Sequence, residues 1–408
     1  MLLFLCAAWF FPTLGMAEEH SLQRIRDKLT TGKEPIRIVC LGDSATAVQY
    51  RIGGRRAWPD MLKIALNRIF PTAKFEVVNS GTNGDTTGAG LRKFDNDVLA
   101  HHPDIVIVFF GANDIVFTPI EEFQKNLVEM VTVARKNGAE VVLCSHNNMD
   151  DATAERGRSN KKLADYVAVI QKVGRENDVP VGNCFEAFTA LRAHDIRSWK
   201  TLFTDTIHLN MDGQKRIAEE IAAAISGKPV SLDDVGPPTP AMPTIFQLLS
   251  AGKRVKMAAM PPYDTLMPMA LRKLFPDAQI EASTWPTESK SIADLLTMAK
   301  NFRDQQCNLI VVAVPASVTC ENSDQFRQLF LEMMHELRSA GFKKWDVVAF
   351  APSLESAELS GAAFDRDQLL RQLIRSGDIA TLFRMPGDRT AATALLETWL
   401  RDQTTATN

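Results

Sequence analysis

The chain has 408 residues, more than one ordinary domain needs, so its length predicts two domains. Apolar residues make up 45% and charged residues 23% of the chain, proportions that are typical of a globular protein. The formal net charge of −3 argues against a nucleic-acid partner, because nucleic-acid binders usually carry a basic excess.

The beginning of the chain resembles an export signal. Residues 1–13 are almost all apolar, and the small residues Gly15 and Ala17 suit cleavage before Glu18. The basic segment that usually precedes such a run is missing. A membrane anchor is the alternative, but the run is shorter than the roughly 18 residues that span a bilayer. We therefore expect a signal peptide over 1–17, export to the periplasm or the outside, and no stable membrane span in the mature chain.

Short apolar runs then alternate with helical patterns as far as residue 225. The continuous apolar run 105–110 is typical of a strand that is buried on both faces. Strands that alternate with helices predict a parallel sheet covered on both sides. The predicted strands are 36–41, 75–78, 105–110 and 141–144, and the predicted helices are 58–70, 123–136, 161–176 and 213–225.

A proline-rich stretch marks the domain boundary. Residues 229–243 contain five prolines, and such a density interrupts both helices and central strands. We expect a first domain over 18–228, a linker over 229–243 and a second domain over 244–408.

Polar motifs follow the predicted strands of the first domain. Gly42-Asp43-Ser44 follows the first strand, Gly81 the second, and Gly111-Ala112-Asn113-Asp114 the third, while Asp205 and His208 precede the last helix. Ligands of parallel sheets bind at the carboxyl ends of the strands, so these motifs are expected to converge.

These residue types suit nucleophilic catalysis on an acyl group. A serine hydroxyl such as that of Ser44 needs a base, and His208 can take its proton. Asp205, three residues before the histidine, can hold the imidazole in the right tautomer. The backbone N–H groups of Ser44 and Gly81 and the side-chain amide of Asn113 are candidate donors for an oxyanion hole.

The ordered motifs resemble those of the SGNH (GDSL-type) hydrolase family over residues 35–225, and most of all its branch of thioesterases, lysophospholipases and arylesterases. The resemblance implies a flavodoxin-like three-layer α/β/α sandwich and the hydrolysis of esters or thioesters without a metal or other cofactor. One departure is Leu209, where many members have proline.

Other polar residues carry weaker signals. Arg51, Arg55 and Arg56 either meet an anionic substrate or form a solvated loop, and the second interpretation is favoured. Residues 146–148, His-Asn-Asn, either line the substrate pocket or form a polar loop. His101, His102 and Asp104 are expected in a solvated loop, because no Cys/His cluster has metal-ligand spacing.

The cysteines do not form a disulfide framework. Signal cleavage removes Cys6, and the five that remain are scattered. Cys40 and Cys144 are expected to be buried thiols. Whether Cys307 and Cys320 pair is left open.

The second half resembles the first at an offset of just over two hundred residues. Residues 275–281 match 70–76, and residues 308–314 match 104–110. In this alignment Pro261-Pro262-Tyr263 replaces the nucleophile motif and Ser317 replaces Asn113, while His335 lies within a predicted helix. The second domain is therefore expected to be a degenerate, non-catalytic copy.

Two other function classes stay open besides an ester hydrolase. One is a non-catalytic protein that binds a glycan or a protein partner, and the other is an acyltransferase that uses the same site. The expected substrate is a small-molecule, glycan or lipid ester. The acyl group, the alcohol and the oligomeric state do not follow from the sequence.

Overall fold

The computed structural model describes residues 22, 25–49, 52–151, 157–302, 307–338 and 345–405. The chain divides into two compact units. The first unit holds the residues up to Thr46, Leu62–Ala190 and Ala218–Val230, and the second holds Ala47–Met61, Leu191–Ile217 and the residues from Ser231 onward. The expected signal peptide over 1–17 lies outside the described residues.

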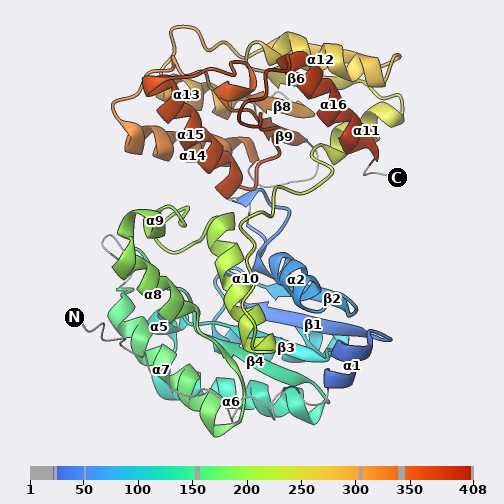
Figure 1. Cartoon of the computed structure of the whole chain (residues 1–408). Coiled ribbons are helices and arrows are strands. Elements are labelled where there is room, and N and C mark those ends of the chain that lie inside the picture. Colours follow the sequence, from blue (N-terminus) through green and yellow to red (C-terminus); the bar gives the residue numbers. More distant parts are fainter. Residues whose placement is uncertain are drawn as a thin grey trace, which may run out of the picture. The chain divides into compact units, whose positions relative to one another are not determined.

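The first unit contains a five-stranded parallel sheet in the order β2-β1-β3-β4-β5 (Figure 1). This is the flavodoxin-like strand order, as expected from the resemblance. The strands are β1 (Pro35–Gly42), β2 (Lys74–Gly81), β3 (Ile105–Phe109), β4 (Glu140–Cys144) and β5 (Val181–Gly182). All residues of β3 and β4 are buried, because helices cover the sheet on both faces.

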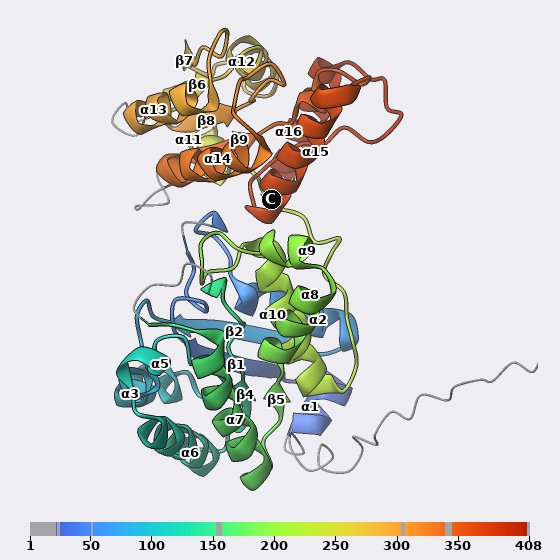
Figure 2. The ribbon, with the colours of Figure 1, turned by 90° about the vertical axis from the view of Figure 1, so that its left-hand side faces the viewer.

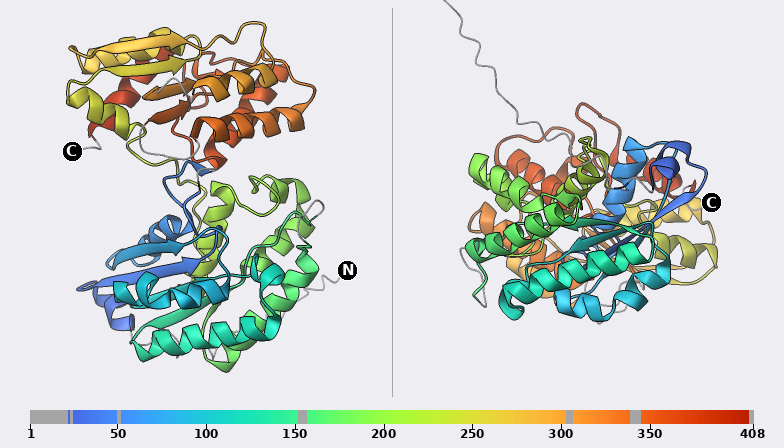
Figure 3. Two further views of the ribbon diagram at one scale, coloured as in Figure 1. Left: turned by 180° about the vertical axis from the view of Figure 1, so that it is seen from behind. Right: turned by 90° about the horizontal axis from the view of Figure 1, so that it is seen from below.

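Helices α6 and α7 lie side by side on one face of this sheet (Figure 2). In the view from below, α6 and α2 lie on opposite sides of the sheet (Figure 3). Ile221 of α10 packs beside Gly182 of β5. The helices up to residue 226 are α1 (Arg26–Thr31), α2 (Trp58–Ile69), α3 (Thr87–Arg92), α4 (Phe94–Asp97), η3 (Leu99–His101), α5 (Asp114–Phe117), α6 (Ile120–Lys136), α7 (Asn160–Glu176), α8 (Cys184–His194), α9 (Ile196–Lys200) and α10 (Met211–Ser226).

A second parallel sheet, in the order β7-β6-β8-β9, lies in the second unit. Its strands are β6 (Val255–Ala259), β7 (Ile280–Thr284), β8 (Leu309–Val312) and β9 (Asp346–Ala349). The helices are α11 (Pro243–Ser250), α12 (Tyr263–Leu274), α13 (Ile292–Phe302), α14 (Ser323–Arg338), η6 (Pro352–Leu354), α15 (Gly361–Ser376) and α16 (Ala392–Thr405). Helix α13 packs beside α14 and α12 beside α16, and the apolar core lies between these helices and the sheet.

Each sheet contains an equivalent backbone contact just before its third strand, β3 in the first sheet and β8 in the second. In the first sheet the side chain of Asp104 accepts a hydrogen bond from the backbone N–H of Arg37, and the backbone N–H of Asp104 donates to the carbonyl of Arg37, both at 2.8 Å. In the second sheet Asn308 makes the same pair of contacts with Lys256, at 2.9 and 2.7 Å. This correspondence agrees with the aligned repeat, although the duplication itself stays a prediction.

Asp104 lies in a partly exposed loop before β3, close to the expectation, and its carboxylate also binds the ammonium group of Lys28 at 2.8 Å. The five cysteines of the described residues are free thiols, so Cys307 and Cys320 are not paired in this structure. Cys40 and Cys144 are buried, as expected.

In the part of the chain that the structure describes, no helix is long and apolar enough to cross a membrane.

Candidate active site

Ser44 and Asn113 follow β1 and β3 of the first sheet, and Gly81 is the last residue of β2, which pairs with β1. Gly42 at the end of β1 pairs with Gly81 of β2 on one side and with Phe109 of β3 on the other. The backbone N–H of Thr82 extends this contact by donating to the carbonyl of Gly42 at 3.0 Å. The structure therefore brings these three candidates to the same edge of the sheet.

A tight turn presents Ser44. The carboxylate of Asp43 accepts a hydrogen bond from the backbone N–H of Ala45 at 2.8 Å, and the carbonyl of Asp43 accepts one from Thr46 at 3.1 Å. A Cβ on Gly42 would lie 2.2 Å from the Thr46 hydroxyl and 2.6 Å from a backbone oxygen of β3. Only glycine allows the strand to end this close to its neighbours.

The backbone N–H of Gly81 already has a partner. It donates to the side-chain oxygen of Asn79 at 2.9 Å, while the amide nitrogen of Asn79 donates to the carbonyl of Thr46 at 2.8 Å. Asn79 thus links the end of β2 to the nucleophile turn. An oxyanion would have to share the Gly81 N–H with Asn79 or displace that side chain.

Contacts at both ends of its carboxamide fix the orientation of Asn113. Its Nδ2 donates to the carbonyl of Asp85 at 2.9 Å, and its Oδ1 accepts from Nη2 of Arg158 at 3.1 Å. Nε of Arg158 also donates to the carbonyl of Ala112 at 3.1 Å. A flipped amide would place its own N–H groups against the guanidinium, so the contacts select one orientation.

The residue after Asn113 is a buried carboxyl group. Oδ1 of Asp114 accepts hydrogen bonds from the backbone N–H and the hydroxyl of Thr87, at 2.9 and 2.6 Å. Asn126 in turn donates to the Thr87 hydroxyl at 3.2 Å. Burial raises the pKa of Asp114 to about 6 although these hydrogen bonds favour the charged form. Asp114 therefore holds the turn after β3 against α3.

Asp43 and His146 form an acid–imidazole pair beneath the nucleophile turn, separate from the Asp205–His208 pair described below. Nε2 of His146 lies 3.6 Å from Oδ2 of Asp43, and each side chain is 1% exposed. Nδ1 of His146 lies 3.0 Å from the carbonyl of Asn147. Residues 146–148 follow β4 without regular secondary structure and are all buried, so they form a polar loop within the packed interior, and their part in a substrate pocket stays a prediction.

Asp205 and His208 form a compact loop in the second unit. Nδ1 of His208 lies 2.8 Å from Oδ2 of Asp205. The other carboxylate oxygen accepts the backbone N–H groups of Ile207 and His208, both at 2.8 Å. The carbonyl of His208 accepts the N–H of Thr204 at 2.8 Å, and α10 begins three residues later. The aspartate thus fixes both the loop and the Nδ1 side of the imidazole.

Sequence reasoning named five candidate residues but did not predict the side-chain contacts around them. Arg158 lies in the loop before α7 and belongs to none of the sequence motifs. It is 45 positions away from Asn113, which it contacts. Asp43 and His146 are likewise distant in the chain, so no local pattern pairs them. No group of metal-binding residues occurs within the described ranges.

Comparisons with known proteins agree with the motifs. The model of the GDSL-like lipase/acylhydrolase family matches residues 40–216. An arylesterase of Vibrio mimicus is 33% identical over 108 residues, which cover 26% of this chain and 52% of the relative, so the chain spans about half the length of that protein. The GDSL esterase/lipase CPRD49 of Arabidopsis thaliana is 24% identical over 46% of this chain and 78% of its own.

A solved structure, a lipase/acylhydrolase from Enterococcus faecalis, is 26% identical and covers 48% of this chain and 99% of its own, with a TM-score of 0.40. The family match spans the region that carries all the motifs described above. The model of the GDSL-like lipase/acylhydrolase family thus matches residues 40–216, and the relatives support an SGNH-type family for this part of the chain.

Proposed function

We propose that the protein is a serine ester hydrolase that cleaves a carboxylic ester or thioester. Ser44 is the nucleophile, His208 the base, and Asp205 the carboxylate that orients the imidazole. The observation that carries the proposal is the 2.8 Å contact between Nδ1 of His208 and Asp205. With Nδ1–H directed at the carboxylate, the lone pair of Nε2 is left to accept a proton.

The reaction follows from these roles. Nε2 of His208 takes the Ser44 proton as Oγ attacks the acyl carbon, and the resulting oxyanion is held by backbone and side-chain donors. The protonated imidazole then gives its proton to the departing alcohol or thiol, which leaves an acyl-serine. A water molecule attacks that ester with His208 again as base, and the acid product departs.

The oxyanion donors in this proposal are the N–H groups of Ser44 and Gly81 and the amide of Asn113. One N–H of the Asn113 amide is used by the Asp85 carbonyl, which leaves the other for the oxyanion. Arg158 keeps the amide in the required orientation. The Gly81 donor contributes to the extent that Asn79 releases it.

The substrate class rests on the relatives, whose names describe an arylesterase and an esterase/lipase. We propose a small-molecule, glycan or lipid ester as substrate, for an exported protein whose first 17 residues are a signal peptide. An acyltransferase would use the same acyl-serine with an alcohol in place of water.

We further propose that residues 244–408 are a degenerate, non-catalytic copy that follows a linker over 229–243. Tyr263, at the position aligned with Ser44, is completely buried, and its ring lies 4.6 Å from that of Phe350. Burial raises the pKa of this phenol, so it is a poor nucleophile. Val314, beside the position aligned with Gly111, is buried as well.

The test is labelling with a fluorophosphonate probe, together with hydrolysis of p-nitrophenyl esters of rising chain length and of acetylated glycans. We expect labelling at Ser44 and loss of several powers of ten in kcat for Ser44→Ala. Ser226→Ala is the matched control, because its hydroxyl donates to a helix carbonyl at the end of α10. Near-normal turnover by a folded Ser44→Ala variant contradicts the proposal, and ester formation with added alcohols would identify an acyltransferase.

A further inference from the structure

The loop between the nucleophile turn and α2 belongs to the second compact unit. The loop begins at Ala47, three residues after Ser44, and ends at Trp58. Of the three arginines that the sequence suggests for an anionic substrate or a solvated loop, Arg51 lies outside the described residues. Arg55 is exposed, as a solvated loop predicts, and both Arg55 and Arg56 bind backbone carbonyls. Arg55 donates to the carbonyl of Pro240 at 3.0 Å and Arg56 donates to that of Gly236 at 2.8 Å.

Arg56 makes its main contact with Asp378, more than three hundred residues away. Nε donates to Oδ2 at 3.0 Å and Nη2 to Oδ1 at 2.5 Å, the two-pronged geometry that suits a guanidinium and a carboxylate. The Arg56 side chain is 15% exposed and that of Asp378 only 2%. Breaking a pair as buried as this leaves a charge without its partner, unlike the loss of a surface ion pair.

Asp378 lies in a turn whose backbone conformation is held by further hydrogen bonds. Asp378 has a left-handed backbone with a φ of 52°, which is uncommon for a residue other than glycine. The partly buried guanidinium of Arg338 holds the turn by donating twice to the carbonyl of Gly377, at 3.0 and 2.7 Å. Burial lowers the pKa of Arg338 to about 10, so it keeps its charge at neutral pH.

The loop backbone also approaches this turn closely. Gly53 has a φ of 89°, and a Cβ on it would lie 3.3 Å from the carbonyl oxygen of Asp378. Any larger residue would be strained there and would push against the turn. Gly53 and Arg56 therefore contact the same short segment.

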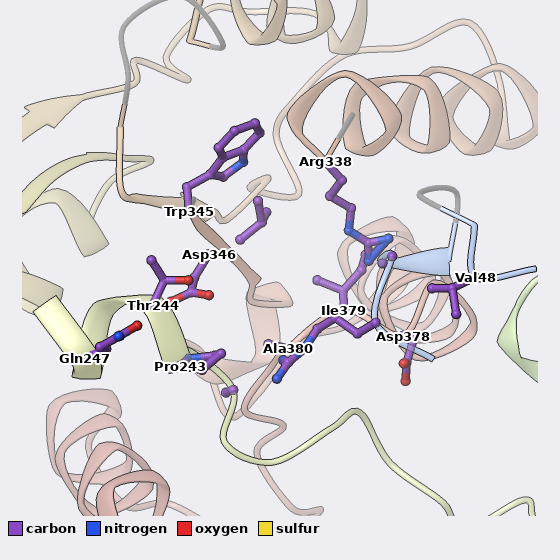
Figure 4. A pocket seen from close by; sticks show the side chains of 15 residues that line it. Val48, Pro243, Thr244, Gln247, Arg338, Trp345, Asp346, Asp378, Ile379 and Ala380 are labelled. Atoms are coloured by element: carbon purple, nitrogen blue, oxygen red, sulfur yellow. The ribbon is translucent and has the colours of Figure 1, made fainter. Parts of the chain in front are cut away.

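The loop and the C-terminal part of the chain are not closely packed beside the Arg56–Asp378 ion pair. A cavity of about 720 Å³ lies beside Asp378, and its lining includes Val48 and Arg55 of the loop and Thr244 and Asp346 of the C-terminal part (Figure 4). Apolar packing across such a space contributes little, because atoms separated by a void lose their contacts. The polar contacts of Arg55 and Arg56 hold the loop together with the buried side chain of Ile52.

The end of the loop is tied to a second functional segment. The backbone N–H of Trp58 donates to the side-chain oxygen of Gln214 at 2.8 Å, and both residues are buried. Gln214 lies in the first turn of α10, which begins three residues after His208. The end of the loop is thus tied to the helix that follows His208.

We propose that the C-terminal part of the chain braces the loop that follows the nucleophile, and that Arg56 and Asp378 are the positioning residues of this brace. The inference rests on the proposed function for its effect on turnover, but the brace itself does not. It assigns the degenerate half a role in the geometry of the active site. Arg56 acts on its carboxylate partner and not on an anionic substrate.

The first test measures kcat and KM for p-nitrophenyl acetate in the full-length chain. We expect Asp378→Asn and Arg56→Gln each to lower kcat about tenfold or more, since small misplacements of reacting groups cost that much. KM should change less than threefold, and Arg56→Lys should keep an intermediate kcat because it retains the charge without the fork. The double variant should lose no more than either single variant, as expected of two residues that act only through each other.

Glu358→Gln is the matched control. It removes the carboxylate of the Glu358–Arg389 pair, whose side chains are 79% and 82% exposed, and should leave kcat unchanged. Folded Asp378→Asn and Arg56→Gln variants with kcat within twofold of the parent would overturn the proposal. So would a fall in kcat that the control shares.

The second test does not depend on activity. Hydrogen exchange in peptides that cover residues 52–57 should become at least tenfold faster in Asp378→Asn, or in Arg56→Gln if the first variant does not fold, and should not change in Glu358→Gln. Unchanged exchange would overturn the brace. If the parent lacks esterase activity and Ser44 is not labelled while the exchange result holds, the proposed function fails and the brace stands.

Discussion

Replacement of Arg158 by alanine tests the oxyanion hole through a residue that the proposed reaction does not use directly. The change removes the 3.1 Å contact with Oδ1 of Asn113 and the 3.1 Å contact with the carbonyl of Ala112. The Asn113 amide then keeps only its contact with the Asp85 carbonyl, so its orientation is held at one end instead of two. The expected result is a lower kcat, because the second N–H no longer points steadily at the oxyanion.

The size of the effect has an upper and a lower bound. Complete loss of one oxyanion donor costs about 10²–10³ in kcat, which is the limit set by removing Asn113 itself. A hydrogen bond to a charged group contributes about 1.5–3 kcal/mol, so losing the restraint at Oδ1 should cost at least about 1.5 kcal/mol. Since about 1.4 kcal/mol corresponds to a factor of ten in rate, we expect kcat to fall about tenfold.

The assay is steady-state hydrolysis of p-nitrophenyl acetate by Arg158→Ala, Asn113→Ala and the double variant. In the Asn113→Ala background the arginine change should have almost no further effect, because the group that it orients is gone. Lys161→Ala, which removes an exposed positive charge from the start of α7, is the control for a general electrostatic effect. An unchanged kcat in Arg158→Ala, or losses that multiply in the double variant, would refute the reasoning.

Three further predictions concern the triad, the nucleophile turn and a buried carboxyl group. Asp205→Asn should leave the circular dichroism spectrum unchanged and lower kcat by about 10⁴, because an asparagine favours the wrong imidazole tautomer; a loss below tenfold would assign another residue to this role. Gly42→Ala should lower the free energy of unfolding by about 1–3 kcal/mol in urea titrations, since its Cβ would lie 2.6 Å from the backbone oxygen of Phe109, whereas Gly236→Ala, with nothing within 4 Å, should be neutral. Asp114 has a pKa of about 6 when folded and an ordinary pKa near about 3.9 when unfolded, so its ionisation destabilises the folded chain above pH 6 and not below pH 4. Relative to Asp114→Asn, the parent should therefore lose up to about 3 kcal/mol of unfolding free energy as the pH rises from 4 to 7, and parallel stability curves for the two proteins would contradict this.

The amino-acid sequence by itself determined the parallel sheet and the placement of the candidate residues along it. The apolar run that ends at Phe110 forms β3, because a strand buried on both faces needs such side chains. Ser44, Gly81 and Asn113 lie at or just after the ends of neighbouring strands because each parallel crossover returns the chain to the same edge. Asp205 and His208 are three residues apart, so their pairing is a local event that the spacing predicts.

Only the tertiary structure decided which side chains hold these residues. His146 lies beneath Asp43 and Arg158 against Asn113, and neither arrangement has a signature in the order of residues. The Gly81 N–H, a plausible free donor in the sequence, is occupied by Asn79.

The two arginines after the nucleophile show the limit most clearly. From the sequence we expect Arg55 and Arg56 to contact either an anionic substrate or solvent. In the folded chain Arg56 instead binds the buried carboxylate of Asp378, 322 residues away. Short-range patterns record which faces of an element are apolar, because burial repeats with the period of the helix or strand. A contact between one charged side chain and one distant partner leaves no periodic trace, so it emerges only when the chain is folded.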